Sequence, residues 1–584
     1  MISSHTLIPL FPALALATGL NGHCPPLGPV LPAPHHPSTH PSISTASTAL
    51  RALLDDLTTP YQTSALAIGV KSIHEPDLLF EYTHTPPQRD AKGVQQVDRD
   101  TVFRLGSLSK VFAPLALLML RDRGVRLDDS VTKYVPELKG LAGQARDEGS
   151  AVWEVDWEEV TLGGLASHMA GIPSDLITDI TPFVNQSAYG YPETNSSRLL
   201  GCAGFFGTPA CNKTAFFKHF GQRPPVQVPF SPQTVYSNIA FPILSFVVEA
   251  VTNQSYVDFV HDNIWKPTNM TRTFASKPDD SLGFIPANDI WWPADLGFEG
   301  PNGGYFSTLT DLHRLADAIL HHRLLPPTQT RKWLKPVTAT SSTGLLIGQP
   351  WEIFRAENIT SDGRLIELYT KTGDLISYHA ILVLIPDYDL VVTVLVAGPG
   401  GVGEAGTAET TGIMSRVVEM LVPAVEEAGK AEAEGKYAGR YVDRDTNSSL
   451  TFAVDNDGPG LAITEYVIRG VDVPSTDPGS TLPPATPPRL DPPMRYRLYP
   501  ATGSKSEREE AWRAVGTRAT AEEVEARDGQ LVWGMGSCVT WAMMDRVTYN
   551  LLARDHFVFG RGGNGRVRGV EAVGYGVRLE REGY

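Results

Sequence analysis

Two segments of the chain place a serine three residues before a lysine, a spacing that can set a nucleophile beside a base. In "FRLGSLSKVFAPLALLML", Ser107 and Lys110 stand immediately before a long apolar run. If a helix begins at or just before Ser107, the two side chains are neighbours on one face, and backbone N–H groups point at negative charge that develops there. The alternative is a serine that only caps a buried helix. The second match, Ser130 and Lys133, lies in the Asp-rich turn "RLDDSVTKY", where we do not expect catalysis.

Two further motifs supply what a nucleophilic serine needs, namely a proton acceptor and an oxyanion site. Tyr236 and Asn238 frame the only Tyr-x-Asn triplet in the chain, in "VYSNIAF". Lys371, Thr372 and Gly373 form a Lys-Thr-Gly triplet at the end of a strand-like run, in "YTKTGD". Each motif stands at the edge of an apolar segment, and their order along the chain favours one shared site.

Together the three motifs resemble those of the serine β-lactamase and penicillin-binding-protein superfamily. The Tyr-x-Asn form is closer to class C β-lactamases and their esterase, peptidase and acyltransferase relatives. The resemblance extends over residues 50–425 and includes "LGGLASHMAGIP" and "GGYFSTLTDLHRLADAIL". It implies an α/β (α+β) fold, with an antiparallel sheet flanked by helices and a helical subdomain. The segments "CPPLGPVLPAP" and "CVTW" resemble secreted fungal β-lactamase-like proteins that carry an extra C-terminal domain.

The resemblance also implies roles for the catalytic side chains. Ser107 would attack an acyl carbonyl, and either Lys110 or Tyr236 would be its base. Burial beside Lys371 would lower the pKa of Lys110, and two nearby cations would lower that of Tyr236. Asn238 would orient Lys110 and the acyl side chain of the substrate.

The strand that carries the third motif would bind the substrate through Lys371, Thr372, Gly373 and Asp374. The oxyanion hole would be the backbone N–H groups of Ser107 and Asp374. Asp374 departs from the pattern of β-lactamases, in which a small residue follows Lys-Thr-Gly. Its carboxylate would repel the anionic group of a β-lactam, so we do not expect β-lactamase activity.

His168 and His379 raise the alternative of a Ser-His-Asp hydrolase. No G-x-S-x-G motif is present to support it. We expect His168 to stabilise a turn and His379 to be a packed or rim residue of a strand.

The leading hypothesis is a secreted serine hydrolase, an esterase, amidase or peptidase, that acts on a small-molecule ester, amide or peptide through an acyl-enzyme. The alternatives are an acyltransferase that uses the same acyl-enzyme and a catalytically silent binding protein. The net charge of −16, without a basic stripe, argues against nucleic acid as a partner. The four cysteines lack the spacing of a zinc site, and no metal or cofactor is expected.

The chain divides into four predicted regions. These are a signal peptide (1–17), a proline-rich extended arm (18–47), a β-lactamase-like catalytic domain (48–425) and a smaller all-β C-terminal domain (432–584). Residues 178–230 lack clear periodicity and are predicted to be a surface insertion. After the signal peptide, no segment has 18 uninterrupted apolar residues, so we expect no membrane span.

Apolar periodicity predicts the elements that position the motifs. Pro114, within the helix that follows Ser107, predicts a kink or a tightened first turn. Helices are predicted at 48–60, 111–124, 240–265, 308–325 and 417–435, and residues 161–175 are predicted to form a short helix closed by a glycine-proline turn. Strands are predicted at 64–73, 365–373 and 378–398, with a turn at 386–389.

Cysteines and sequons indicate an oxidising, glycosylating compartment. Cys202 and Cys211 are close enough in sequence to bridge locally, which leaves Cys24 to pair with Cys538. The second bridge would make the arm a strap to the β domain, where Cys538 lies in a strand-like apolar run. Glycosylation is predicted at the seven N-x-[ST] sequons, Asn185, Asn195, Asn212, Asn253, Asn269, Asn358 and Asn447.

Overall fold

The structure is a computed structural model that describes most of the chain after the predicted signal peptide. The signal peptide (1–17) and the sequons Asn195 and Asn358 lie outside the described residues. The described residues are 24–141, 152–175, 181, 184–193, 202, 209–221, 223–357, 359–476, 486, 489–501, 506, 508–532, 538, 540–563 and 566–583.

The larger part of the chain is built on an antiparallel sheet of eight strands, ordered β2-β1-β10-β9-β8-β7-β6-β5. Runs of β-branched and other apolar residues favour the central strands. In β10, Val391 and Leu395 enter the core on one face, and Val392 and Val394 enter the core on the other. The strands are β1 (Ala65–Ser72), β2 (Phe80–His84), β5 (Thr338–Ala339), β6 (Leu345–Ile347), β7 (Glu352–Ala356), β8 (Ile366–Asp374), β9 (Tyr378–Ile385) and β10 (Leu390–Ala397).

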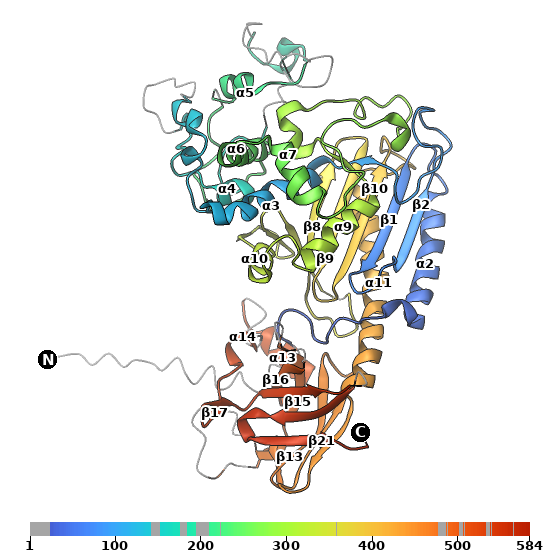
Figure 1. Cartoon of the computed structure of the whole chain (residues 1–584), viewed down its shortest axis with the longest axis vertical. Helices are drawn as coiled ribbons and strands as arrows, with labels where there is room; N and C mark the ends of the chain where they lie inside the picture. Colours follow the sequence, from blue (N-terminus) through green and yellow to red (C-terminus); the bar gives the residue numbers. More distant parts are fainter. Residues whose placement is uncertain are drawn as a thin grey trace, which may run out of the picture.

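Helices cover both faces of this sheet (Figure 1). In α11 the buried residues Val418, Leu421, Val422 and Val425 follow helical periodicity and pack on one face with α2. Helix α9 and a helical subdomain lie on the other side, and this arrangement confirms the predicted fold class. The helices are α2 (Pro41–Thr58), α3 (Phe112–Met119), α4 (Leu162–Ala166), α6 (Ala240–Thr252), α7 (Tyr256–Val260), α8 (Gly300–Gly303), α9 (Leu309–Leu320), α10 (Pro327–Trp333) and α11 (Thr407–Tyr437), and a two-stranded ribbon joins β3 (Phe103–Arg104) to β4 (Phe306–Ser307).

The predicted surface insertion contains a core helix, α5 (Lys213–Phe220). Phe216 and Phe220 are buried, and the Phe216 ring centroid lies 4.8 Å from that of Phe298. The expectation of a surface segment is therefore wrong for α5. Two phenylalanines four residues apart mark one buried helix face, a signal too short to stand out from the glycine and proline around it.

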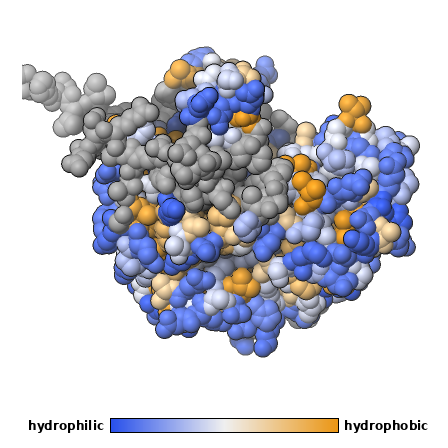
Figure 2. Space-filling view, turned by 90° about the horizontal axis from the view of Figure 1, so that it is seen from above, coloured by the Kyte–Doolittle hydropathy of each residue, from blue (hydrophilic) through white to orange (hydrophobic). Residues whose placement is uncertain are grey.

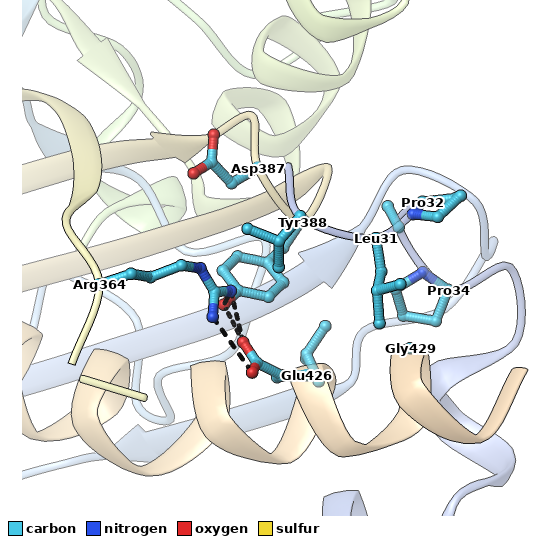
Figure 3. Close-up of a pocket in the computed structure, with 11 residues that line it drawn as sticks. Leu31, Pro32, Pro34, Arg364, Asp387, Tyr388, Glu426 and Gly429 are labelled. Atoms are coloured by element: carbon cyan, nitrogen blue, oxygen red, sulfur yellow. Dashed lines mark hydrogen bonds and ion pairs between the residues drawn. The ribbon is translucent and has the colours of Figure 1, made fainter. Parts of the chain in front are cut away.

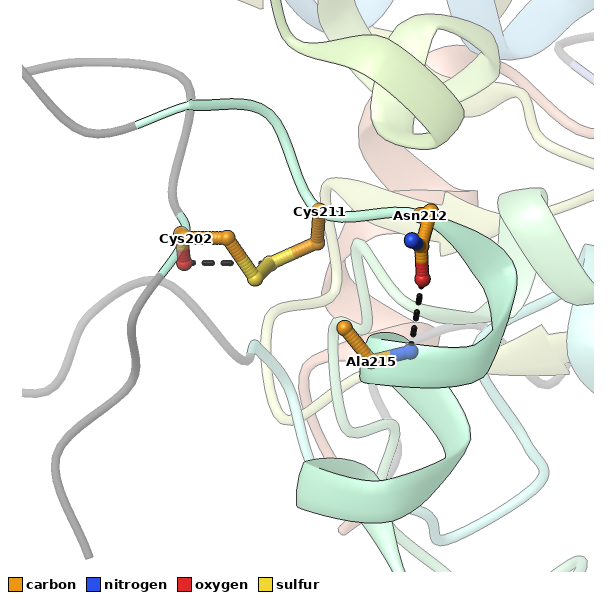
Figure 4. The surroundings of a disulfide bond; sticks show 4 residues. All are labelled: Cys202, Cys211, Asn212 and Ala215. Carbon is orange, nitrogen blue, oxygen red and sulfur yellow. Dashed lines mark hydrogen bonds between the residues drawn. A yellow bond between two sulfur atoms is a disulfide. The ribbon is translucent and has the colours of Figure 1, made fainter. Parts of the chain in front are cut away.

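A disulfide between Cys202 and Cys211 lies directly before α5, with a Cα–Cα distance of 4.9 Å (Figure 4). The Asn212 side-chain oxygen accepts a hydrogen bond from the Ala215 backbone N–H at 2.9 Å, which caps the helix start. The local bridge predicted from sequence is present.

The C-terminal strands close into a barrel in the order β12-β11-β21-β20-β19-β16-β15-β13, because β12 also pairs with β13. Trp512, Phe557 and Phe559 fill its core, and this region confirms the predicted all-β domain. The run after Cys538 was predicted to be strand-like, but it forms the short helix α14 (Thr540–Met543). The other elements are β11 (Gly439–Asp443), β12 (Ser448–Ala453), β13 (Leu461–Ile468), β14 (Val471–Asp472), β15 (Arg495–Pro500), β16 (Glu509–Thr517), β17 (Thr548–Tyr549), β18 (Leu552–Ala553), β19 (His556–Arg561), β20 (Val567–Ala572), β21 (Val577–Arg581), α12 (Val473–Thr476) and α13 (Ala521–Asp528).

Helix α11 joins the sheet to the barrel without a break (Figure 1). Its first half packs on the sheet, whereas Ala433 and Tyr437 lie in the barrel core. The predicted domain limits at residues 425 and 432 fall inside this helix. An Ala- and Glu-rich sequence of high helix propensity continues through them.

The proline-rich arm is shorter than predicted, because α2 begins at Pro41 rather than near residue 48. A disulfide joins Cys24 at its described start to Cys538 beside the barrel, with a Cα–Cα distance of 5.4 Å. The second predicted bridge is therefore present and ties the arm to the C-terminal domain.

The middle of the arm packs against α11 and the neighbouring end of the sheet (Figure 3). Leu31 belongs to the barrel core, and Pro34 lies against α11. Beside them, buried Arg364 binds the Glu426 carboxylate and the Tyr388 hydroxyl. Apolar packing and the buried ion pair between Arg364 and Glu426 together hold the three parts of the molecule at this junction.

The surface seen from the end of the molecule far from the barrel is mainly hydrophilic, with isolated hydrophobic residues (Figure 2). Within the described ranges, no helix has both the length and the apolar composition needed to cross a membrane. The sequon asparagines that the structure describes are exposed, namely Asn185, Asn212, Asn253, Asn269 and Asn447.

Candidate active site

Ser107 and Lys110 lie on the 3₁₀ helix η3 (Gly106–Val111), which leads into α3. Residues three apart stack above one another in a 3₁₀ helix, because it has three residues per turn. Lys110 Nζ lies 2.8 Å from Ser107 Oγ, and Lys110 is 0% exposed. The tightened first turn, one of the two outcomes predicted from Pro114, brings the two side chains into contact.

The backbone before Ser107 is pressed against the end of β8. A Cβ atom at Gly373 would lie 1.9 Å from the Leu105 carbonyl oxygen, and one at Gly106 would lie 2.6 Å from the Asp374 backbone nitrogen. Gly106 also has a φ of 53°, which glycine adopts without steric cost. The two glycines thus allow the backbone at Ser107 to meet that of Asp374, whose N–H groups are the predicted oxyanion donors.

Two oxygens besides the serine hydroxyl hold Lys110 in place. Its Nζ lies 2.7 Å from Asn238 Oδ1 and 2.7 Å from the Asn302 carbonyl oxygen. The Asn238 amide in turn donates to the Asp175 carboxylate at 2.7 Å. These contacts orient the amine toward Ser107.

Tyr236 lies over both lysines of the site. Its ring centroid is 5.1 Å from Lys110 Nζ and 5.6 Å from Lys371 Nζ. The ring stacks on buried His168, with centroids 4.3 Å apart, and His168 Nδ1 accepts the Ser237 backbone N–H at 3.1 Å. His168 therefore stabilises the turn that presents Tyr236, as predicted.

The ionisable groups around the serine have shifted pKa values. Burial lowers the pKa of Lys110 below its ordinary value, and the ammonium of Lys371 lowers it further. Burial of the Tyr236 hydroxyl acts to raise its pKa, but the charges of Lys110 and Lys371 outweigh burial and lower it. Lys371 differs because the Glu352 carboxylate outweighs burial and raises its pKa. The site therefore holds a protonated Lys371 beside two groups that lose a proton more readily than usual.

A carboxylate that no sequence motif marks binds the Lys-Thr-Gly triplet. Glu352 Oε1 lies 2.6 Å from Lys371 Nζ, and Oε2 accepts from the Thr372 hydroxyl at 2.7 Å and the Thr372 N–H at 2.9 Å. Glu352 is the first residue of β7 and pairs with Thr370. Its position depends on strand register, which no local motif reveals.

Asp374 is bound on both carboxylate oxygens. Its Oδ2 accepts from His379 Nδ1 at 3.1 Å and from the Thr407 hydroxyl, and Oδ1 accepts the Ile376 N–H at 2.8 Å. Partial burial acts to raise its pKa, but the hydrogen bonds from His379 and Thr407 lower it to about 2. Asp374 is therefore ionised at neutral pH. His379 is buried, as a packed residue should be, and it also orients this carboxylate.

A buried carboxyl group, Glu299, lies behind Lys110. Glu299 Oε2 accepts from the Asn302 amide at 3.1 Å, and burial followed by the charge of Asp175 raises the Glu299 pKa to about 8. Glu299 is thus protonated at neutral pH, and no sequence pattern marks it. In the part of the chain that the structure describes, no group of three or more His, Cys, Asp or Glu side chains is placed to hold a metal ion.

The chain is similar to several known proteins. Residues 75–411, more than half of the chain, match the family described as "Beta-lactamase", and residues 429–583 match "Beta-lactamase-like-like, C-terminal domain". A "Beta-lactamase-like protein" of Arthroderma benhamiae is 28% identical over 96% of each chain. "Probable hydrolase M10" of a Phoma species is 26% identical over 71% of this chain and 67% of its own. A solved D-stereospecific amidohydrolase from a Streptomyces species covers 64% of this chain and 97% of that one, with 19% identity and a TM-score of 0.46.

Proposed function

The chain belongs to the beta-lactamase family, and we propose that it is a secreted serine hydrolase that cleaves an ester or amide through an acyl-enzyme on Ser107. The observation that carries the proposal is the 2.8 Å contact between the buried Lys110 Nζ and Ser107 Oγ. A lysine with an ordinary pKa is protonated at neutral pH and cannot accept a proton. Burial lowers the pKa of Lys110, which makes it a usable base.

In the acylation step Ser107 Oγ forms a bond to the acyl carbon as its proton passes to Lys110 Nζ or to the Tyr236 oxygen. The backbone N–H groups of Ser107 and Asp374 stabilise the oxyanion that forms. The tetrahedral intermediate then breaks its bond to the leaving alcohol or amine. That group takes the proton from the same base.

In the deacylation step water attacks the acyl carbon and gives a proton to the Lys110 and Tyr236 pair. The bond to Ser107 Oγ breaks, the proton returns to that oxygen, and a carboxylic acid is released. Asn238 keeps the Lys110 amine aligned in both steps. Lys371 keeps its proton, and its charge lowers the pKa of Tyr236.

Secretion is the second part of the proposal. Two disulfides, Cys24–Cys538 and Cys202–Cys211, fit an oxidising compartment. The exposed sequon asparagines are accessible to glycosylation. Expression in a eukaryotic host, with endoglycosidase treatment and N-terminal sequencing of the exported protein, tests this part. Retention in the cell without glycans would contradict it.

Intact-mass analysis tests the catalytic part. We expect a fluorophosphonate to add a single adduct that peptide mapping assigns to Ser107. A panel of activated esters, amides and D-amino-acid peptides then identifies the acyl groups that accumulate on the same residue. A catalytically silent binding protein would stay unmodified by every member of the panel.

A further inference from the structure

An anion-binding position lies beside the candidate nucleophile, and the chain fills it with its own carboxylate. Three donors converge there, namely the ammonium of Lys371, the hydroxyl of Thr372 and the backbone N–H of Thr372. Glu352 accepts from all three, with both carboxylate oxygens, at 2.6 to 2.9 Å. Hydrogen bonds with an ionised partner are about twice as strong as neutral ones, so this carboxylate is firmly held.

The position is close to the reacting atoms. Lys371 Nζ is 5.6 Å from the ring centroid of Tyr236, and Lys110 Nζ, which contacts Ser107 Oγ at 2.8 Å, lies 5.1 Å from the same centroid. The Lys371 side chain is only 1% exposed, whereas that of Glu352 is 19% exposed. The Glu352 carboxylate is therefore more accessible to solvent than the Lys371 ammonium that it binds.

The neighbouring end of β8 adds another negative charge and an apolar side chain. The Asp374 side chain, which carries an ionised carboxylate, is 43% exposed. Two residues further on, Ile376 is 63% exposed with a φ of 60°, a strained conformation for a β-branched residue. Asp374 stabilises that conformation by accepting the Ile376 N–H. The surface next to the site thus disfavours anions and offers apolar contact.

From these contacts we propose that Glu352 determines specificity by occupying the anion-binding position of Lys371 and Thr372. The substrates are consequently esters or amides that carry no carboxylate on the part that faces these two residues. An anionic group there would have to displace Glu352 from three hydrogen bonds, and the displaced carboxylate would then lie beside a second negative charge, which is unfavourable. This inference rests on the proposed serine hydrolase function and narrows its substrate class.

The test uses two thioesters of hippuric acid that differ only in the leaving thiol, thioglycolic acid in one and its primary amide in the other. Thiol release and the mass of the Ser107 acyl-enzyme report the reaction of each compound. We expect wild-type protein to favour the amide over the acid by at least about tenfold in kcat/KM. This ratio corresponds to a difference of about 1.4 kcal/mol in transition-state free energy.

Three variants locate the cause of that preference. Glu352→Gln removes the charge at constant size, and we expect the preference for the amide to fall about tenfold. Glu352→Asp withdraws the carboxylate by one methylene and should give a smaller fall while Lys371 keeps a counter-ion. Glu357→Gln is the matched control, because it removes the same charge from an exposed position just after β7. It should keep the wild-type ratio.

The outcomes separate this inference from the proposed function. If wild-type protein hydrolyses the thioesters but favours the acid, or if both Glu352 variants fold and keep the wild-type ratio, the assignment of Glu352 is overturned while the hydrolase stands. If wild-type protein neither labels with a fluorophosphonate nor reacts with either thioester, the proposed function fails and this inference falls with it. Thermal melting of each variant identifies those that are folded.

Discussion

Ser107 with Lys110 and Ser130 with Lys133 have the same spacing and both lie on 3₁₀ turns, yet their surroundings differ. Lys110 is 0% exposed and its Nζ contacts Ser107. The Lys133 side chain is 53% exposed and points to a carboxylate instead of Ser130. Spacing alone therefore does not make a lysine a base for a serine. The elements packed around the turn decide it.

The surroundings of the two lysines also shift their pKa values in opposite directions. A hydrogen bond to Asp129 raises the pKa of Lys133, so this lysine stays protonated. Burial lowers the pKa of Lys110. Asn238 and Asn302, which hold Lys110, are uncharged and leave that shift in place. Lys110, beside the neutral amide of Asn238, can therefore lose its proton and act as a base. Lys133, beside the carboxylate of Asp129, keeps its proton and cannot.

The largest expected effect separates the two serines. Ser107→Ala should abolish labelling by a fluorophosphonate and all acyl-enzyme formation, because it removes the attacking oxygen. Ser130→Ala should leave the labelling rate unchanged. Intact-mass analysis of both variants measures this. Equal losses in the two variants would show that the nucleophile is wrongly assigned.

The next effect concerns the base. Lys110→Ala and Tyr236→Phe should each lower the acylation rate by about 10²- to 10⁴-fold, the usual contribution of a general base. If the two groups act as one unit, the double variant should be little slower than the worse single variant. Lys133→Ala is the matched control and should react at the wild-type rate. Strictly additive losses would mean that Lys110 and Tyr236 act separately.

A smaller effect should follow when the packing behind Ser107 is disturbed. Gly373→Ala places a methyl group 1.9 Å from the Leu105 carbonyl oxygen, which forces β8 away from η3. A displacement of about 1 Å at an active site can cost about 10²-fold in rate. We expect labelling of Ser107 to slow by about 10- to 100-fold while the protein remains folded, as circular dichroism can verify. Unchanged labelling would show that the contact does not position the nucleophile.

The sequence predicted those parts of the site that are written in local motifs. Ser107, Lys110, Asn238 and Lys371 come together as the motifs indicate. Glu352 could not be predicted, because its place depends on how β7 aligns with β8. Asp175 lies in a loop and Glu299 ends a short 3₁₀ helix, both without a recognisable sequence pattern, and only the folded chain brings them near Lys110.

Some elements of the fold could likewise be predicted from the sequence, and others could not. Strands β8, β9 and β10 were predictable because long buried runs leave few alternatives. Helix α5 was missed because two phenylalanines are a weak signal within a loop-like composition. The Cys24–Cys538 bridge followed from elimination once Cys202 and Cys211 were paired. Elimination works for cysteines because four of them allow only three pairings.

The acid behind Lys110 gives a pH-dependent prediction that has no counterpart at Lys133. Because the Glu299 pKa is about 8 in the folded protein, against 4.5 ordinarily, the folded state keeps a proton that the unfolded chain loses between these values. The free energy of unfolding should therefore fall as pH rises from about 5 to 8. Glu299→Gln should reduce this fall by roughly 3 to 5 kcal/mol. Urea titrations of both proteins at several pH values measure it, and identical pH profiles would contradict the buried acid.

The smallest effect concerns the structural role of Ser130. Its Oγ accepts the Thr132 backbone N–H at 3.3 Å and caps η5 (Val131–Lys133). Removing a capping hydroxyl costs about 1 kcal/mol, because one backbone donor at the helix start loses its partner. Ser130→Ala should therefore lower the free energy of unfolding by about that amount, and Ser130→Asn, which can also cap, should restore most of it. If Ser130→Ala instead lost activity at unchanged stability, the structural role of Ser130 would be contradicted and Ser130 would take part in catalysis.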